Sequence, residues 1–110
     1  RPTLYEAYHG IVPVTEPAHG TATEPYDVVG PVCESGDTFA LQRALPAMAP
    51  DELVAILSAG AYGAVMSSTY NTRPLIPEVL VNGDQFSVIR PRVSVEELLA
   101  LDRVPDWLKD

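Results

Sequence analysis

Eleven prolines spread over 110 residues restrict the fold of this chain more than any other feature of its sequence. A proline lacks a backbone donor and disrupts the interior of a helix, so little room remains for long helices. Short strands separated by turns fit this spacing better. We therefore predict a mainly β domain, barrel-like in its arrangement, with a short C-terminal helix.

Apolar runs bounded by turn residues mark the expected strands and the connections between them. The expected strands are 10–15, 26–33 with an interruption at Gly30–Pro31, and a buried run at 53–59, while 16–25 reads as a polar loop and 41–51 as a weakly helical connection. Within 75–90, two β-rich runs flank Asn82–Gly83–Asp84, which predicts a hairpin.

Helix signals lie near both ends of the chain. Pro2 suits a first helical turn, and Gly10 suits the end of that helix. Ser94 and Glu97 have the spacing of a capping box at a helix N-terminus. The residues expected to pack this second helix down are Leu98, Leu101 and Trp107.

Charge and composition exclude some classes of partner. The net charge of −8 argues against nucleic-acid binding, because little in the chain would neutralise phosphates. No apolar run approaches membrane-spanning length and no signal peptide is visible, so we expect no membrane association. A single cysteine cannot form a disulfide within one chain and fits a reducing, cytoplasmic location. The chain starts with Arg1 rather than Met, and we expect it to be part of a longer protein.

Cys33 and Glu34 stand side by side in a segment built to turn, between Gly30–Pro31 and Gly36–Asp37. A thiol in an exposed turn can donate or accept a proton, and an adjacent carboxylate favours the neutral form that donates. Glu34 itself can pair with an ammonium group. The alternative is that Cys33 is a small core residue at the end of a strand, as free cysteines often are. The residues alone leave both interpretations open.

Two further groups of residues suggest binding chemistry. The glycines around Tyr62 allow a backbone to approach a ligand closely, and its phenol can donate to a phosphate oxygen, although no standard phosphate-binding motif is present. If 2–8 is helical, Arg1 and Tyr5 lie on one face and can clamp a carboxylate. The alternatives are a tight turn with a packed Tyr62, a surface Arg1 and a packed Tyr5.

Other chemistry-bearing residues form no recognisable site. His9 and His19 lack the spacing of metal ligands, and we expect both to be solvated or to cap backbone groups. Lys109, near the end of the chain, is the only lysine. Alone, the chain does not have the residues of a complete enzyme.

Taken together and in order, these motifs resemble the C-terminal domain of the diaminopimelate decarboxylase family. This family belongs to the fold-type III enzymes that use pyridoxal 5'-phosphate (PLP). The matching stretches are RPTLYEAYH at 1–9, YDVVGPVCESGD at 26–37, GAYGAVMSSTYNTRP at 60–74, PEVLVNGD at 77–84, and VIRPR with EELLALD within 88–102. The resemblance therefore covers nearly all of the chain.

The resemblance implies a mainly β, C-terminal β-barrel domain over 1–110, with short helices near 2–8, 61–67 and 94–102. It also implies that an N-terminal (β/α)8 barrel, absent from this chain, carries the lysine that holds PLP. The active enzyme would be a homodimer with shared active sites, converting meso-2,6-diaminopimelate to L-lysine and carbon dioxide.

By motif, the resemblance assigns a role to each candidate residue. Tyr62 would hydrogen-bond the PLP phosphate and lie near the substrate. Arg1 and Tyr5 would bind the carboxylate at the non-reacting end of the substrate, and Glu34 its ammonium group. Cys33 would protonate the substrate carbon after carbon dioxide leaves, from a loop that reaches the partner subunit's site.

Two other functions remain open. The first is a sister decarboxylase acting on carboxynorspermidine, ornithine or arginine. The ornithine and arginine enzymes typically show Cys followed by Asp, where this chain has Cys33–Glu34. The second is a non-catalytic β-barrel module that binds a small ligand or a partner.

Overall fold

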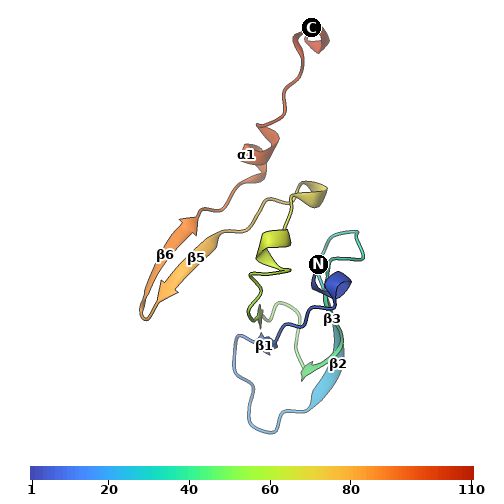
Figure 1. The fold of residues 1–110 in the computed structure, drawn as a ribbon, viewed down its shortest axis with the longest axis vertical. Coiled ribbons are helices and arrows are strands. Elements are labelled where there is room, and N and C mark those ends of the chain that lie inside the picture. Colours follow the sequence, from blue (N-terminus) through green and yellow to red (C-terminus); the bar gives the residue numbers. More distant parts are fainter. The chain divides into compact units, whose positions relative to one another are not determined.

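The computed structural model describes all of residues 1–110 and divides them into two compact units, Arg1–Ser67 and Ser68–Asp110. Figure 1 labels the main elements. The first unit contains η1 (Pro2–Tyr5), β1 (Ile11–Pro13), β2 (Thr23–Val29), β3 (Thr38–Pro46), β4 (Val54–Ile56) and η2 (Ala64–Met66). The second contains η3 (Tyr70–Thr72), β5 (Glu78–Asn82), β6 (Gln85–Arg90), α1 (Val95–Leu99) and η4 (Asp106–Leu108).

The strands pair into three two-stranded antiparallel sheets, β1–β4, β2–β3 and β5–β6. The prediction of mainly strands with few helices is therefore confirmed, while no closed barrel is present in the structure. A small core in the first unit joins β1 to β3 through Ile11, Ala40 and Leu45, each less than a tenth exposed. No helix in the structure combines the length and the apolar character needed to cross a membrane.

The β2–β3 ladder corrects two predictions about 26–33 and 41–51. Strand β2 begins earlier than expected, at Thr23, and ends at Val29, so Cys33 lies beyond it. The segment read as weakly helical supplies the second half of β3, because its backbone pairs with β2 as far as Pro46. Gln42 has a positive φ of 49° beside a register irregularity, and its backbone and side-chain amides both donate to Asp27 Oδ1, at 2.8 and 3.0 Å.

The predicted strand at 10–15 is confirmed in part as β1, but the buried strand predicted at 53–59 is wrong in extent and burial. Only Val54–Ile56 pairs, with β1, and Leu53 is 69% exposed. Ser58 adopts a left-handed φ of 54°, which extended backbone does not have. The apolar composition of 53–59 predicted a buried strand, but the β1–β4 ladder has only three residue pairs and does not bury the whole segment.

The hairpin in the second unit is confirmed. Asn82 pairs with Gln85 across a two-residue loop of Gly83 and Asp84. Gly83 has φ +61°, the left-handed conformation that glycine adopts without a steric penalty. A positive φ at the first loop position is the pattern of a type II′ turn, which suits the twist of a hairpin.

The helices predicted near 2–8 and 94–102 begin where expected but are shorter, and the one predicted near 61–67 begins later, at Ala64. Near 2–8, one 3₁₀ turn ends at Glu6 in a left-handed conformation rather than at Gly10. Near 61–67, the structure has only η2. The capping box of α1 is confirmed, since Ser94 Oγ accepts from the Glu97 amide at 3.0 Å and Glu97 accepts from the Ser94 amide at 2.8 Å.

The packing predicted for the C-terminal helix is not found for two of its three residues. Leu101 and Trp107 are 77% and 81% exposed. Helix α1 ends at Leu99, and Trp107 lies in the separate turn η4, which follows Pro105. The break between these elements removes the common helical face on which that packing depended.

Candidate functional site

Four of the residues predicted to bind a ligand meet within the first unit, around η1. The main-chain nitrogen of Arg1 donates to the carbonyl oxygen of Tyr62 at 2.9 Å. The rings of Tyr5 and Tyr62 pack with centroids 5.4 Å apart and a tilt of 35°. Arg1 Nε lies 3.7 Å from Glu34 Oε2. Residues far apart in the sequence thus form one cluster, which we call the Arg–Tyr cluster.

Arg1 and Tyr5 are presented by a short, well-anchored turn. Pro2 is fully buried, and its fixed φ suits the start of a helix. The Ala7 amide donates to the Pro2 carbonyl at 2.9 Å, and the left-handed Glu6 closes the turn. Tyr5 remains 56% exposed, so a ligand can reach this residue.

Tyr62 lies in a tight loop whose backbone is strained. It has a φ of +59°, an uncommon conformation for an aromatic residue. The Ala64 amide closes the loop on the Ala59 carbonyl at 2.7 Å. A Cβ at Gly63 would overlap that carbonyl, so the sequence needs a glycine here. The loop holds the exposed phenol of Tyr62 against η1.

The Cys33–Glu34 loop is closed at its base by backbone and side-chain hydrogen bonds. The Gly30 amide donates to the Asp37 carbonyl at 2.8 Å, and the Val32 amide donates to Asp37 Oδ2 at 2.9 Å. The Gly36 amide donates to Glu34 Oε1 at 2.9 Å. These bonds fix the shape of 30–37 and direct one oxygen of Glu34 inward while the other approaches Arg1.

Close packing places the same loop against η1. Gly36 is buried, and a Cβ there would stand 2.7 Å from Leu4 Cδ1. Thr3 Oγ1 adds a hydrogen bond to the Thr38 carbonyl at 3.2 Å. Cys33 is exposed in the middle of the loop, so the interpretation of it as a core residue is wrong.

Mixed charges meet at Arg1. The Arg1 guanidinium lies beside the carboxylate of Glu34, with Nε 3.7 Å from Oε2. A guanidinium and two phenols can donate to an anionic group, and Glu34 can accept from a cationic one. The cluster can therefore hold a group that carries both charges, such as the head of an amino acid.

His9 was predicted to be solvated or to cap backbone groups. The first alternative is wrong, because His9 is only 5% exposed, whereas its contact with a backbone carbonyl agrees with the second. Its Nδ1 lies 3.2 Å from the Leu57 carbonyl, and its Nε2 is buried without a partner. His19 is exposed, as expected. No local signal distinguishes the two histidines, because burial of His9 depends on a contact 48 residues away.

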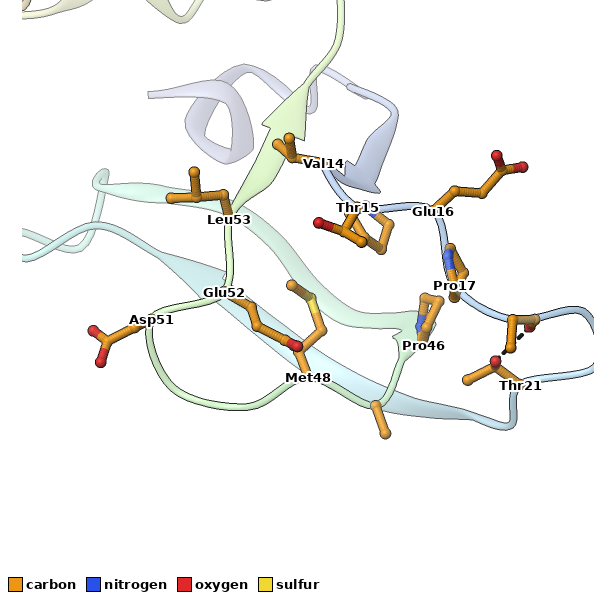
Figure 2. A pocket seen from close by; sticks show the side chains of 13 residues that line it. Val14, Thr15, Glu16, Pro17, Thr21, Pro46, Met48, Asp51, Glu52 and Leu53 are labelled. Carbon is orange, nitrogen blue, oxygen red and sulfur yellow. Dashed lines mark hydrogen bonds between the residues drawn. The ribbon is translucent and has the colours of Figure 1, made fainter.

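A cavity of about 510 Å³ lies elsewhere in the first unit, between the loops around 14–21 and 47–53. Figure 2 shows Met48 and several prolines lining it, with the carboxylates of Glu16 and Asp51 pointing away from the space between the loops. Its lining contains no Lys, Arg or His, and it includes none of the predicted site residues. The Arg–Tyr cluster with the Cys33–Glu34 loop is the stronger candidate site for an anionic ligand.

Two curated relatives that match nearly the whole chain carry the same name. Diaminopimelate decarboxylase of Zymomonas mobilis is 53% identical over 108 residues, which make up 98% of this chain and 25% of that protein. The enzyme of the same name from Archaeoglobus fulgidus is 47% identical over 108 residues, 98% of this chain and 26% of that protein. The chain spans about a quarter of the length of these relatives.

Solved structures agree with the sequence comparison. Diaminopimelate decarboxylase from M. jannaschii in co-complex with L-lysine matches 99% of this chain with a TM-score of 0.85 and 35% identity, and 24% of that chain is covered. The Helicobacter pylori enzyme complexed with L-lysine matches 92% of this chain with a TM-score of 0.78 and 44% identity, again over 24% of that chain.

A family model identifies the domain type. The model described as "Pyridoxal-dependent decarboxylase, C-terminal sheet domain" matches residues 1–60, more than half of the chain. This part contains η1, the Cys33–Glu34 loop and the β2–β3 ladder. The chain therefore belongs to the family of C-terminal sheet domains of pyridoxal-dependent decarboxylases.

Proposed function

We propose that this chain is the C-terminal domain of a PLP-dependent diaminopimelate decarboxylase, which converts meso-2,6-diaminopimelate to L-lysine and carbon dioxide. The observation that carries the proposal is the meeting of Arg1, Tyr5, Tyr62 and Glu34 around η1. The names of the relatives, which match over nearly the whole chain, support the same reaction.

The substrate suits the charges of the Arg–Tyr cluster. Diaminopimelate carries a second amino-acid head, with a carboxylate and an ammonium group, at its non-reacting end. In the proposal, Arg1 and Tyr5 donate to this carboxylate, and Glu34 accepts from the ammonium group. The existing pair, Arg1 Nε to Glu34 Oε2 at 3.7 Å, is partly exposed. Because the Cys33–Glu34 loop is proposed to serve the partner's site, Glu34 would leave this pair for the ammonium group bound there, and Arg1 would leave it for the carboxylate bound in its own subunit's site.

Tyr62 is the residue proposed to hold the cofactor. Its 41%-exposed phenol is a neutral donor suited to a phosphate oxygen, and its strained loop fixes the ring against Tyr5. When bound, PLP supplies the electron sink that makes decarboxylation of an amino acid possible. The chain's only lysine, Lys109, is paired with Asp106 at 2.7 Å. We place the lysine that holds PLP in an N-terminal (β/α)8 barrel of the full-length protein.

Cys33 is the proposed proton donor. Its exposed thiol holds a proton at Sγ, which would pass to the substrate carbon once carbon dioxide has left. The base of its loop is rigidly closed, so the thiol is presented at a defined position beside Glu34. We propose that the loop serves the active site of the partner subunit in a cytoplasmic homodimer. The open sheets of this chain would be completed to a barrel by the rest of the full-length protein.

Release of carbon dioxide by the full-length protein tests the substrate assignment. With PLP present, meso-diaminopimelate should be turned over in preference to carboxynorspermidine, ornithine or arginine. Arg1→Ala and Glu34→Ala each remove a charge-assisted contact, so kcat/KM should fall by about 10- to 150-fold. Glu16→Ala removes an exposed carboxylate that belongs neither to the Arg–Tyr cluster nor to the Cys33–Glu34 loop and that points away from the cavity in Figure 2, and it serves as the control.

Each alternative function has its own outcome in this assay. Unchanged turnover in Arg1→Ala and Glu34→Ala would contradict the assignment of the substrate-binding residues. Preference for another amine would favour a sister decarboxylase. No release from any of these amines, with PLP bound, would favour a non-catalytic binding module.

Mixed dimers test the proton donor and the shared site together. Cys33→Ala and Tyr62→Phe subunits, each of low activity alone, are combined and allowed to exchange. If the loop serves the partner's site, each mixed dimer regains one intact site, and the mixture recovers about a quarter of wild-type activity. If each subunit uses its own Cys33, mixing restores nothing.

A further inference from the structure

We infer that His9 is a positioning residue, which holds the Tyr62 loop opposite η1 through a hydrogen bond from its Nδ1–H to the carbonyl of Leu57. The inference rests on the proposed function only in taking Tyr62 as a ligand-binding residue. His9 touches no proposed ligand, and it acts through the segment that carries Tyr62.

The contacts of His9 determine which ring nitrogen carries the proton. A carbonyl oxygen only accepts, so the 3.2 Å contact requires a proton on Nδ1. Nε2 is buried and has no partner. An apolar side chain would fill the same space without leaving a buried polar atom unpaired. Packing alone therefore does not explain an imidazole at this position, whereas the bond to Leu57 does.

The bond to Leu57 fixes the start of the Tyr62 loop. The Leu57 amide donates to the Gly10 carbonyl at 2.8 Å, so two consecutive residues hold both backbone groups of Leu57. Ser58 then turns the chain with a φ of +54°, and the loop carrying Tyr62 follows directly. A change in the direction of the Leu57 carbonyl would therefore be passed into that loop.

His9 itself is held from another strand. Arg43 of β3 donates from Nη1 to the His9 carbonyl at 2.7 Å, and its guanidinium lies 4.2 Å from the centre of the Tyr8 ring. The backbone at residue 9 is thus tied to β3, while its side chain is tied to the end of β4.

Two hydrogen bonds therefore hold the Tyr62 loop near the ring contact between Tyr5 and Tyr62. One runs from Arg1 to the Tyr62 carbonyl, and the other runs from His9 to the Leu57 carbonyl. The hydrogen bond of Arg1 acts at the tip of the loop, and the hydrogen bond of His9 acts at its start. Losing either one should loosen the ring contact more than it destabilises the domain as a whole.

Two amide substitutions separate positioning from packing. His9→Asn places an N–H near the position of Nδ1 and can keep the bond to Leu57, whereas His9→Gln places its N–H near the position of Nε2. Both side chains are polar and uncharged. In the full-length protein, His9→Gln should weaken PLP affinity and lower kcat/KM about 10-fold, while His9→Asn stays within about threefold of wild type.

A measurement on the ligand-free protein tests the role of His9 independently of the proposed reaction. In the ligand-free full-length protein, hydrogen exchange at the Ala64 amide, which closes the Tyr62 loop, should quicken in His9→Gln and not in His9→Asn. Nitrogen NMR of the wild-type imidazole should show the proton on Nδ1. If diaminopimelate is not turned over but both results hold, the proposed function fails and the positioning role stands.

Three results would overturn the inference. One is a proton on Nε2 in the wild-type protein. Another is loop exchange and PLP affinity in His9→Gln that match those of wild type. The third is an equal loss in both variants that follows their melting temperatures, because this is what a purely structural role predicts.

Discussion

Replacing Gly30 by alanine should weaken the hydrogen bonding that closes the base of the Cys33–Glu34 loop. The φ of Gly30 lies outside the left-handed region, so its backbone conformation does not itself demand glycine. The obstacle is the carboxylate of Asp37, which a Cβ at Gly30 would overlap. That carboxylate must then move away and give up its 2.9 Å hydrogen bond from the Val32 amide.

The size of the effect follows from this lost bond. A hydrogen bond from an amide to a partly buried carboxylate contributes about 1.5–3 kcal/mol. The 2.8 Å bond between the Gly30 amide and the Asp37 carbonyl is made by backbone atoms and can survive. At about 1.4 kcal/mol for each factor of ten, opening of the loop should become about 10- to 150-fold more frequent.

Hydrogen exchange at the Val32 amide in the full-length protein measures this opening directly. Gly30→Ala should accelerate exchange there, with little change at amides of α1. Gly60→Ala is the matched control, because a Cβ at Gly60 meets nothing within 4 Å and its φ is not left-handed. Exchange at Val32 should be unaffected by the control substitution.

A double-mutant cycle with Asp37→Ala can refute the reasoning. Asp37→Ala alone removes the same hydrogen bond and should accelerate Val32 exchange to a similar degree. Because the clash then no longer exists, adding Gly30→Ala should cost almost nothing more. If the two effects simply multiply, the overlap with the Asp37 carboxylate is not the cause.

Three further substitutions probe other parts of the fold. Leu45→Ala removes a core side chain that is 5% exposed and should lower the free energy of unfolding by about 2–5 kcal/mol in denaturant titrations, whereas Leu41→Ala, at a site 63% exposed, should cost far less. Gly83→Ala forces a left-handed φ on alanine and should weaken protection of hairpin amides by about 1–2 kcal/mol. The Ser94 hydrogen bonds lower the pKa of Glu97 below its ordinary 4.5, so the capping contribution is full above that pH and is lost as pH falls through the lower folded pKa. The larger contribution comes from the Ser94 backbone amide, which Ser94→Ala keeps, so carbon NMR should show this pKa rising only in part in that variant, and a further fall would contradict the assignment.

Features set by neighbouring residues were predictable from the sequence. The capping box of Ser94 and Glu97 needs only residues three apart, and the hairpin at Gly83 needs only a two-residue loop between β-rich runs. The second half of β3 was not predictable, because its conformation depends on pairing with β2. The exposure of Trp107 likewise follows from a break in the helix that its apolar character does not reveal.

In the candidate site, too, the sequence indicated groupings of nearby residues but not the contacts between distant ones. Arg1 and Tyr5 were grouped from the sequence because they are close along the chain, and the structure places both at η1. Tyr62 and Glu34 were named separately, and only the tertiary fold brings them to η1. The burial of His9 was not predicted, because a buried and an exposed histidine look alike until the contact with Leu57 is known. Resemblance to a family supplied roles for the named residues but not the contacts that join them.

The Arg1–Glu34 contact is compatible with a loop that serves the partner subunit. The two side chains are 45% and 27% exposed and 3.7 Å apart, and such a pair contributes at most about 1 kcal/mol. The bonds of Gly30, Val32 and Asp37 set the loop's shape without it. The backbone can therefore stay closed while the outer oxygen of Glu34 leaves Arg1 for an ammonium group. An Arg1→Ala variant should accordingly leave Val32 exchange unchanged while it weakens substrate binding, which separates the rigid loop from the exchangeable carboxylate it carries.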